Sequence, residues 1–329
     1  MTYGWDGRSV VTMGRLERAS AIDVARGACA RVAWYAFGRP CAWSLCANDR
    51  ARVAWGGECD DDGLVDALGP SSVDVVDDDA EATLLRALRE ANAGKTAHVR
   101  GTFETHLTCV RDWLRDALEA PAACSTAGLG HTAYGSELFP VRLARFGRDR
   151  SFLARACGGA CERLMFLYGT ASQRRWYRTV LEDSRSGDDS GFEAVNFYTG
   201  ETMRARPLEA GLVTLMHAAD ILSVLTPTRE RAASTALGFA MYLVSRAADM
   251  LRAAARDARR DGETFAWNVD EYADRLDTSI SDEIVRRMVL DAPPDARAFR
   301  DAAAARARAR LRATRFDVVL VLRATGAFD

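Results

Sequence analysis

The sequence predicts a mainly α-helical protein with a small α+β unit formed by its two ends. From Asp79 onward, apolar residues recur at intervals of three and four over long stretches, which is the spacing of amphipathic helices. Before that point, the runs CAWSLCA and RARVAWG, separated by Asn48-Asp49, favour a β-hairpin. The chain ends in FDVVLVLRA, whose β-branched residues predict a strand over 316–324. Because one strand is not stable alone, we expect it to pair with the N-terminal hairpin.

Length and composition indicate a soluble globular protein. The chain has 329 residues, of which 48% are hydrophobic, and a formal net charge of −2. Without clustered positive charge, a chain-wide nucleic-acid surface is not expected. No apolar run reaches the length of a membrane span, since LGFAMYLVSRAADML is interrupted by Arg246 and Asp249. The cysteines occur in helical or strand-like contexts and no charged-then-apolar leader opens the chain, so we expect a reduced, cytoplasmic protein with free thiols.

The basic residues are almost all arginine, because Lys95 is the only lysine. Arginine stays protonated when buried and binds carboxylate or phosphate through two donors. An arginine-lined pocket would therefore suit an anionic small-molecule substrate. Genome base bias also produces an Ala/Arg-rich composition, which would leave the arginines without a shared role. A homo-oligomer is compatible with this composition.

The first region, residues 1–90 with the strand 316–324 added, is predicted to be the α+β unit. A helix over residues 19–37 precedes the hairpin, and a short helix, GLVDALG, and a third strand, SVDVV, follow it. The next helix covers Ala80–Ala93 and ends at Gly94.

The second region, residues 91–228, is predicted to be a helical core. A helix over Thr102–Leu118 places His106 on its apolar face. A short helix is predicted from Pro121 to Leu129, and His131 lies just after its end. Further helices are predicted over SFLARACGGACERLMFLYGT and RWYRTVLED, and the turn NFYTGE precedes a helix from Pro207 to Leu225.

The third region, residues 229–315, is predicted to consist of helices that pack on this core. One long helical pattern covers 229–260, a second lies within 272–290, and Pro293-Pro294 starts a third.

Two histidines and one aspartate of the core form a candidate metal site. His106, His131 and Asp220 would provide two neutral imidazoles and a carboxylate, a set that suits iron, manganese or zinc and leaves open positions for water or substrate. His98 lies about 80° from His106 around an ideal helix and could flank the site. His217 shares a helix face with Asp220 and is a further candidate ligand. Alternatively, these histidines are hydrogen-bonded core residues, with Thr132, Tyr134 and Asp220 as partners.

The same residues resemble the HD-domain superfamily, in which a histidine, a His-Asp pair and a later aspartate lie on successive helices. The resemblance is nearer to an uncharacterised branch that has His-Ser/Thr in place of His-Asp. It is carried by His98, His106-Leu107 with Trp113, the run AGLGHTAYGSE (127–137), the turn Phe197–Glu201, and Ala219-Asp220. The likeness covers residues 95–225 and implies an HD-like helical bundle.

One residue departs from the superfamily pattern. Thr132 follows the second histidine, where the superfamily has an aspartate that binds metal. A neutral threonine is a poor substitute for a carboxylate, which counts against chemistry with two metal ions.

The resemblance implies two enzymatic functions. In a metal-dependent hydrolase of a phosphorylated or nucleotide-like substrate, Arg100 or Arg142 would hold the phosphate and Glu137 would transfer a proton. In an HD-fold oxygenase, iron would bind dioxygen and a small organic substrate. A third alternative is a metal-free binding protein, with a ligand pocket shaped by Tyr134–Glu137 and Thr199–Glu201. The hydrolase is the favoured hypothesis, with Glu137, Arg100 and Tyr134 as candidate catalytic residues.

Overall fold

The computed structural model of the protein describes residues 64, 67–69, 79–91, 93–95, 97–98, 101–137, 143–144, 149–182, 192–225, 235–288, 300–302 and 304–305. The predicted N-terminal helix and hairpin, the third strand and the strand over 316–324 lie outside these residues, as do Arg100 and Arg142. Of His98 the backbone alone is described.

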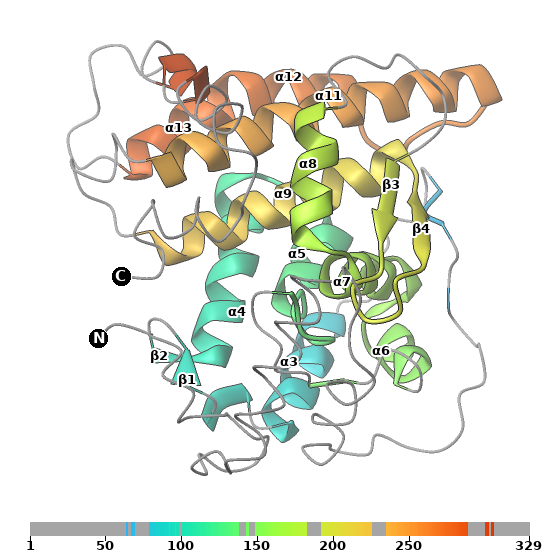
Figure 1. Cartoon of the computed structure of the whole chain (residues 1–329), viewed down its shortest axis with the longest axis vertical. Helices are drawn as coiled ribbons and strands as arrows, with labels where there is room; N and C mark the ends of the chain where they lie inside the picture. Colours follow the sequence, from blue (N-terminus) through green and yellow to red (C-terminus); the bar gives the residue numbers. More distant parts are fainter. Residues whose placement is uncertain are drawn as a thin grey trace.

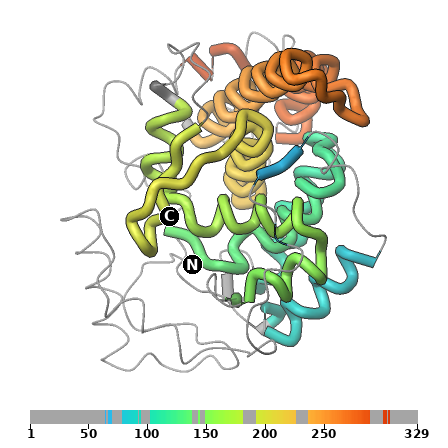
Figure 2. The backbone as a smooth tube through the Cα atoms, turned by 90° about the vertical axis from the view of Figure 1, so that its right-hand side faces the viewer, coloured from blue at the N-terminus to red at the C-terminus, as the bar shows by residue number. Residues whose placement is uncertain are grey.

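The described residues are mostly helical, as the sequence predicts, and the helices are arranged around α9 (Pro207–Val224). This helix is apolar on all sides, the pattern of a helix surrounded by protein. It contacts α4, α5 and α7 on one side and α11 (Thr235–Asp261) on the other. Figures 1 and 2 show α11 to α13 as a layer on one side of α9 and the helices α3 to α7 on the opposite side.

α9 is also the one described helix long and apolar enough to cross a membrane. Of that window, 83% is buried inside the protein. Its hydrophobicity is therefore explained by its place in the core of the fold.

The helices before α9 follow the predicted order. They are α3 (Ala80–Glu90), α4 (Phe103–Asp112) continued by a π-helical turn η3 (Trp113–Ala117), and α5 (Ala122–Leu129). α4 begins where the Thr102 side chain accepts a hydrogen bond from the Thr105 amide, which satisfies one of the free N–H groups at the helix start. Three apolar residues of this helix, Phe103, Leu107 and Val110, are buried in the core.

The segment SFLARACGGACERLMFLYGT forms two helices where one continuous pattern was predicted. α6 (Arg150–Cys157) ends and α7 (Gly159–Thr170) begins on either side of Gly158, whose φ of 86° is incompatible with an α-helix. α8 (Gln173–Glu182) follows as predicted. The turn at Phe197–Glu201 joins two strands, β3 (Phe192–Val195) and β4 (Thr202–Ala205), which were not predicted.

The C-terminal helices are α11, α12 (Val269–Asp277) and α13 (Ser279–Met288). The predicted helix within 272–290 is therefore two helices, separated at Thr278, whose φ and ψ of −124° and −100° are not helical. α12 packs on α11, and α13 contacts η3.

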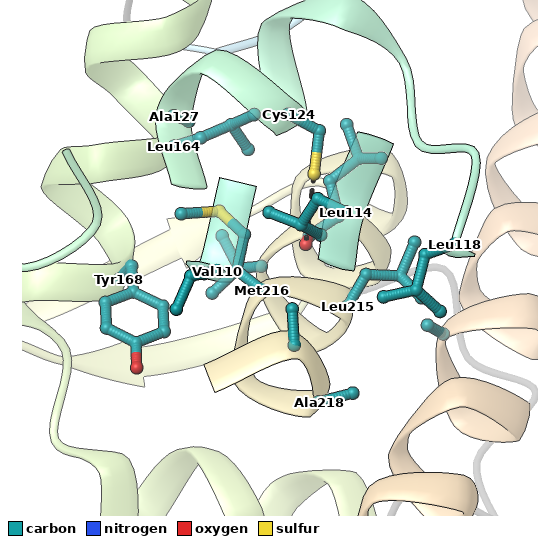
Figure 3. Close-up of a cluster of buried hydrophobic side chains, with 14 of the residues drawn as sticks. Val110, Leu114, Leu118, Cys124, Ala127, Leu164, Tyr168, Leu215, Met216 and Ala218 are labelled. Atoms are coloured by element: carbon teal, nitrogen blue, oxygen red, sulfur yellow. Dashed lines mark hydrogen bonds between the residues drawn. The ribbon is translucent and has the colours of Figure 1, made fainter. Parts of the chain in front are cut away.

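One hydrophobic core joins parts of all three predicted regions. It contains Leu68 and Leu84 from the first region, Leu215 from the second and Leu251 from the third. Figure 3 shows the part of this core where α4, η3, α5, α7 and α9 meet. A second small hairpin, β1 (Ala97–His98) with β2 (Gly101–Thr102), leads into α4 and was not predicted.

Candidate metal centre

His106 lies on the buried face of α4, as predicted, and its ring is oriented by α9. Its Nδ1 lies 3.2 Å from the Ser223 hydroxyl, and that hydroxyl donates its proton to the Asp220 carbonyl at 2.7 Å. Because the hydroxyl has only one proton, it accepts a hydrogen bond from Nδ1–H of His106. The other ring nitrogen of His106, Nε2, faces Asp220 Oδ1 at 3.3 Å.

His131 lies in the turn after α5 and is completely buried. Its Nδ1 is 2.8 Å from the Gly128 carbonyl, which can only accept, so Nδ1 carries the proton. Its Nε2 lies 3.9 Å from Asp220 Oδ1 and has no hydrogen-bond partner among the described residues. A buried nitrogen without a partner is uncommon in a folded protein and calls for an explanation.

Asp220 lies near the end of α9, and its side chain is 29% exposed. Its Oδ1 faces both imidazoles, while Oδ2 accepts a hydrogen bond of 2.7 Å from the Tyr168 hydroxyl. The two carboxylate oxygens therefore have separate partners. No arginine or lysine among the described residues forms an ion pair with this carboxylate.

These three ligand atoms lie within 4.8 Å of one another, and the group is the one set of metal-ligand type found among the described residues. Two atoms bound to one ion at about 2.1 Å lie at most about 4.2 Å apart, so small side-chain movements would close the group. A proton on His106 Nε2 would satisfy the contact with Asp220 but would leave His131 Nε2 without a partner. A cation satisfies all three atoms. The residues present fit a divalent metal ion.

The protonation states also suit a metal ion. Burial lowers the pKa of His131 to about 4, against the attraction of Asp220, so the ring is neutral at pH 7. Burial raises the pKa of the Asp220 carboxyl, but its interactions with His106 and His131 outweigh burial and hold that pKa below its ordinary value. A neutral imidazole and an ionised carboxylate are the forms that bind metal. In each histidine the Nδ1 proton is held by a protein acceptor, as is usual for metal-binding histidines.

His217 lies three residues before Asp220 on α9 but outside the ligand group. Its ring is 4.4 Å from that of Tyr168 and 5.0 Å from that of Tyr177, measured between centroids. Its Nδ1 lies 3.2 Å from the Tyr177 hydroxyl, and its Nε2 has no hydrogen-bond partner among the described residues. Burial lowers the pKa of His217 to about 3. It is a neutral, buried neighbour of the site.

The other predicted site residues have partners elsewhere or are not described. The Tyr134 hydroxyl donates to Glu162 at 2.6 Å, and Glu137 accepts hydrogen bonds from the Ser172 hydroxyl and the Arg174 amide, both at 3.2 Å. These contacts belong to the packing of α7 and to the start of α8, so the catalytic roles of Tyr134 and Glu137 stay predictions. Arg100 and the His98 side chain lie outside the description.

Two residues of the site were missed by sequence reasoning. Ser223 orients His106 from a position three residues after Asp220, and this spacing on one helix could have indicated it. Tyr168 was missed because a tyrosine in an apolar helix does not reveal which acceptor its hydroxyl will reach.

Comparison with known proteins gives one match. A family model described as a domain of unknown function, DUF6817, matches residues 87–173, the part of the chain that carries His106 and His131 but not Asp220. No curated protein and no solved structure matches the chain.

Proposed function

We propose that this protein is a cytoplasmic enzyme that binds one divalent transition metal ion through His106, His131 and Asp220 and hydrolyses a small phosphorylated or nucleotide-like substrate. The observation that carries the proposal is the convergence of two oriented imidazole nitrogens on one carboxylate oxygen, with no other partner for His131 Nε2 among the described residues. Manganese, iron and zinc all suit this ligand set.

The chemistry requires that the ion retain open positions. A divalent ion bound here would lower the pKa of a bound water and polarise a phosphoryl oxygen. Asp220 supplies one negative charge and the two imidazoles supply none, so the site would keep a net positive charge that attracts an anion. Because His131 is fully buried while the Asp220 side chain is partly exposed, a substrate would approach the ion from the Asp220 side.

A single ion is favoured over two. Thr132, at the position of the aspartate in HD domains, is buried, and its hydroxyl has no hydrogen-bond partner among the described residues. It brings no charge to the site, and the ligand group contains three residues. Paired-metal mechanisms depend on carboxylates that bridge or flank both ions, and here there is one carboxylate.

An iron-dependent oxygenase is the second candidate. Two histidines and one carboxylate with open positions form the ligand set that non-haem iron oxygenases use. The specific observation in its favour is that the group provides three protein ligands, which would leave room for both dioxygen and an organic substrate.

Metal analysis of protein purified without chelator tests the shared premise. We expect about one equivalent of metal per chain, lost in His131→Gln and Asp220→Ala. Asp249→Ala is the matched control, because Asp249 is a half-exposed carboxylate on α11 that pairs with Arg246 at a distance from the site. Wild-type protein that binds no manganese, iron or zinc would refute both metal-dependent functions.

Activity assays separate the two candidates. Hydrolysis of a panel of nucleotides and phosphomonoesters with Mn²⁺, abolished in a folded Asp220→Ala variant, would support the hydrolase. Oxygen consumption by the Fe²⁺-loaded protein, with a change in its visible spectrum and no phosphatase activity, would support the oxygenase instead.

A further inference from the structure

Tyr168 gives the two oxygens of Asp220 different environments. Its hydroxyl donates to Oδ2 at 2.7 Å, while Oδ1 faces His106 and His131. A hydrogen bond to an ionised carboxylate is about twice as strong as one between neutral groups. The oxygen that receives it is less available to a metal ion than the other oxygen.

The position of this hydroxyl is held by dense packing. Tyr168 is completely buried on α7, and its ring lies edge-on to His131, with 4.9 Å between centroids, and against His217 on another side. Figure 3 shows Tyr168 at the edge of the apolar cluster, with its hydroxyl directed out of it. The next residue, Gly169, lets α7 approach the turn that carries His131, because a Cβ there would lie 3.0 Å from the Gly135 carbonyl.

From these contacts we propose that Tyr168 is a positioning residue, which keeps Asp220 bound to the metal ion through Oδ1 alone. The inference rests on the proposed metal site and concerns the number of positions left open on the ion. A six-coordinate ion with two imidazoles and one carboxylate oxygen has three positions for water and substrate, whereas a carboxylate bound through both oxygens would leave two.

The chain offers a matched control in Tyr177. This tyrosine is also buried beside His217, and its hydroxyl lies 3.2 Å from His217 Nδ1, whereas the hydrogen bond to Asp220 Oδ2 comes from Tyr168. Tyr177→Phe and Tyr168→Phe therefore remove the same atom from the same buried environment. They differ in whether Asp220 loses its hydrogen bond.

The experiment measures Mn²⁺ affinity by competition titration and records the visible spectrum of the Co²⁺-loaded protein for wild type and both variants. Tyr168→Phe should weaken Mn²⁺ binding by about 10- to 100-fold, the usual effect of losing a partner that orients a ligand. Its Co²⁺ spectrum should also change as the carboxylate turns to bind through both oxygens. Tyr177→Phe should resemble wild type in both measurements.

Equal affinity and an unchanged Co²⁺ spectrum in Tyr168→Phe would overturn this inference and leave the proposed metal site intact. A wild-type protein that binds neither ion would overturn both. If Tyr168→Phe does not fold, X-ray absorption spectroscopy of the wild-type Mn²⁺ protein can determine whether Asp220 binds the ion through one oxygen or two. One carboxylate oxygen on the ion supports the role of Tyr168, and two oxygens exclude it.

Discussion

Two described carboxylates, Glu162 and Asp220, each accept a hydrogen bond from a tyrosine hydroxyl. They differ in which groups balance their negative charge. Glu162 on α7 accepts from Tyr134 at 2.6 Å, and both of its oxygens bind the Arg150 guanidinium at 2.7 Å. Asp220 accepts from Tyr168 at 2.7 Å, but among the described residues its second oxygen faces only imidazoles. Glu162 is therefore paired with an arginine, whereas among the described residues Asp220 has neither an arginine nor a lysine partner.

The comparison shows how a structural polar cluster differs from a ligand site. Glu209 follows the pattern of Glu162, since it is buried, pairs with Arg163 at 2.8 Å and accepts from the amides of Leu68 and Arg206. Near Asp220, by contrast, two buried imidazoles have an Nε2 without a hydrogen-bond partner among the described residues: those of His131 and His217. A fold that satisfies two buried carboxylates through arginine has the means to satisfy a third. Among the described residues Asp220 has no arginine partner, and with His106 and His131 it forms a group that could hold a metal ion.

The largest loss of stability is expected from breaking the cluster of Glu162, Arg150 and Tyr134. Arg150→Ala leaves Glu162 buried and unpaired, so it should lower the free energy of unfolding by about 3–5 kcal/mol. Urea denaturation checks this value. Arg286→Ala is the control, because its ion pair with Glu283 is exposed and its loss should change stability little. A loss at Arg150 as small as that at Arg286 would mean that Glu162 is not a structural charge.

Added metal should stabilise the protein through the cluster of His106, His131 and Asp220, and not through the Glu162 cluster. At a free metal concentration about 100 times its Kd, Mn²⁺ or Zn²⁺ should raise the free energy of unfolding by about 2.7 kcal/mol. Thermal unfolding with and without metal measures this gain. Arg150→Ala should keep the metal-dependent gain although it starts less stable, while His131→Gln should lose it. An equal gain in His131→Gln would place the bound metal elsewhere.

Removing the hydroxyl of Tyr134 or of Tyr168 compares the Glu162 and Asp220 clusters at the level of a single atom. Tyr134→Phe removes a hydrogen bond to a charged group and should cost about 1.5–3 kcal/mol of folding stability, without a change in metal affinity. Tyr168→Phe should show its main effect in metal affinity. Denaturation and metal titration of both variants give the two readouts. Similar behaviour of the two variants in both assays would contradict the distinction between the clusters.

The smallest expected effect concerns the approach of α7 to the His131 turn. Gly169→Ala places a Cβ 3.0 Å from the Gly135 carbonyl and 3.1 Å from Tyr134 Cβ, so the helix and the turn must separate. We expect a stability loss of about 1–3 kcal/mol and weaker metal binding, because His131 lies in that turn. Gly69→Ala, with nothing within 4 Å of its Cβ, is the control for both measurements. Unchanged metal affinity in Gly169→Ala would show that the site does not depend on this contact.

Much of the helical order could be predicted from the chain, because apolar periodicity reports which face of a helix is buried. The α4 and α9 patterns placed His106 and Asp220 on helices that do pack together. The breaks at Gly158 and Thr278 were missed because periodicity continues across a change of helix direction. The β3–β4 hairpin was missed because its strands have four residues each, too few for alternation to be distinctive.

The site divides in the same way. The three candidate ligands could be named in advance, because histidine and aspartate are scarce in apolar helices and their chemistry suits a metal ion. The distances between their ligand atoms could not be predicted, since they depend on how closely α4, α5, α7 and α9 pack. The roles of Ser223 and Tyr168 depend on the same packing.

By itself the amino-acid sequence determined which segments are helices and which faces turn inward, because both follow from interactions between residues three or four positions apart. Only the tertiary structure decided that, among the residues it describes, His131 Nε2 has no hydrogen-bond partner and Asp220 pairs with no arginine. Those are properties of atoms from different helices, and they arise when burial removes water and each polar group keeps only the partners that the packed chain supplies.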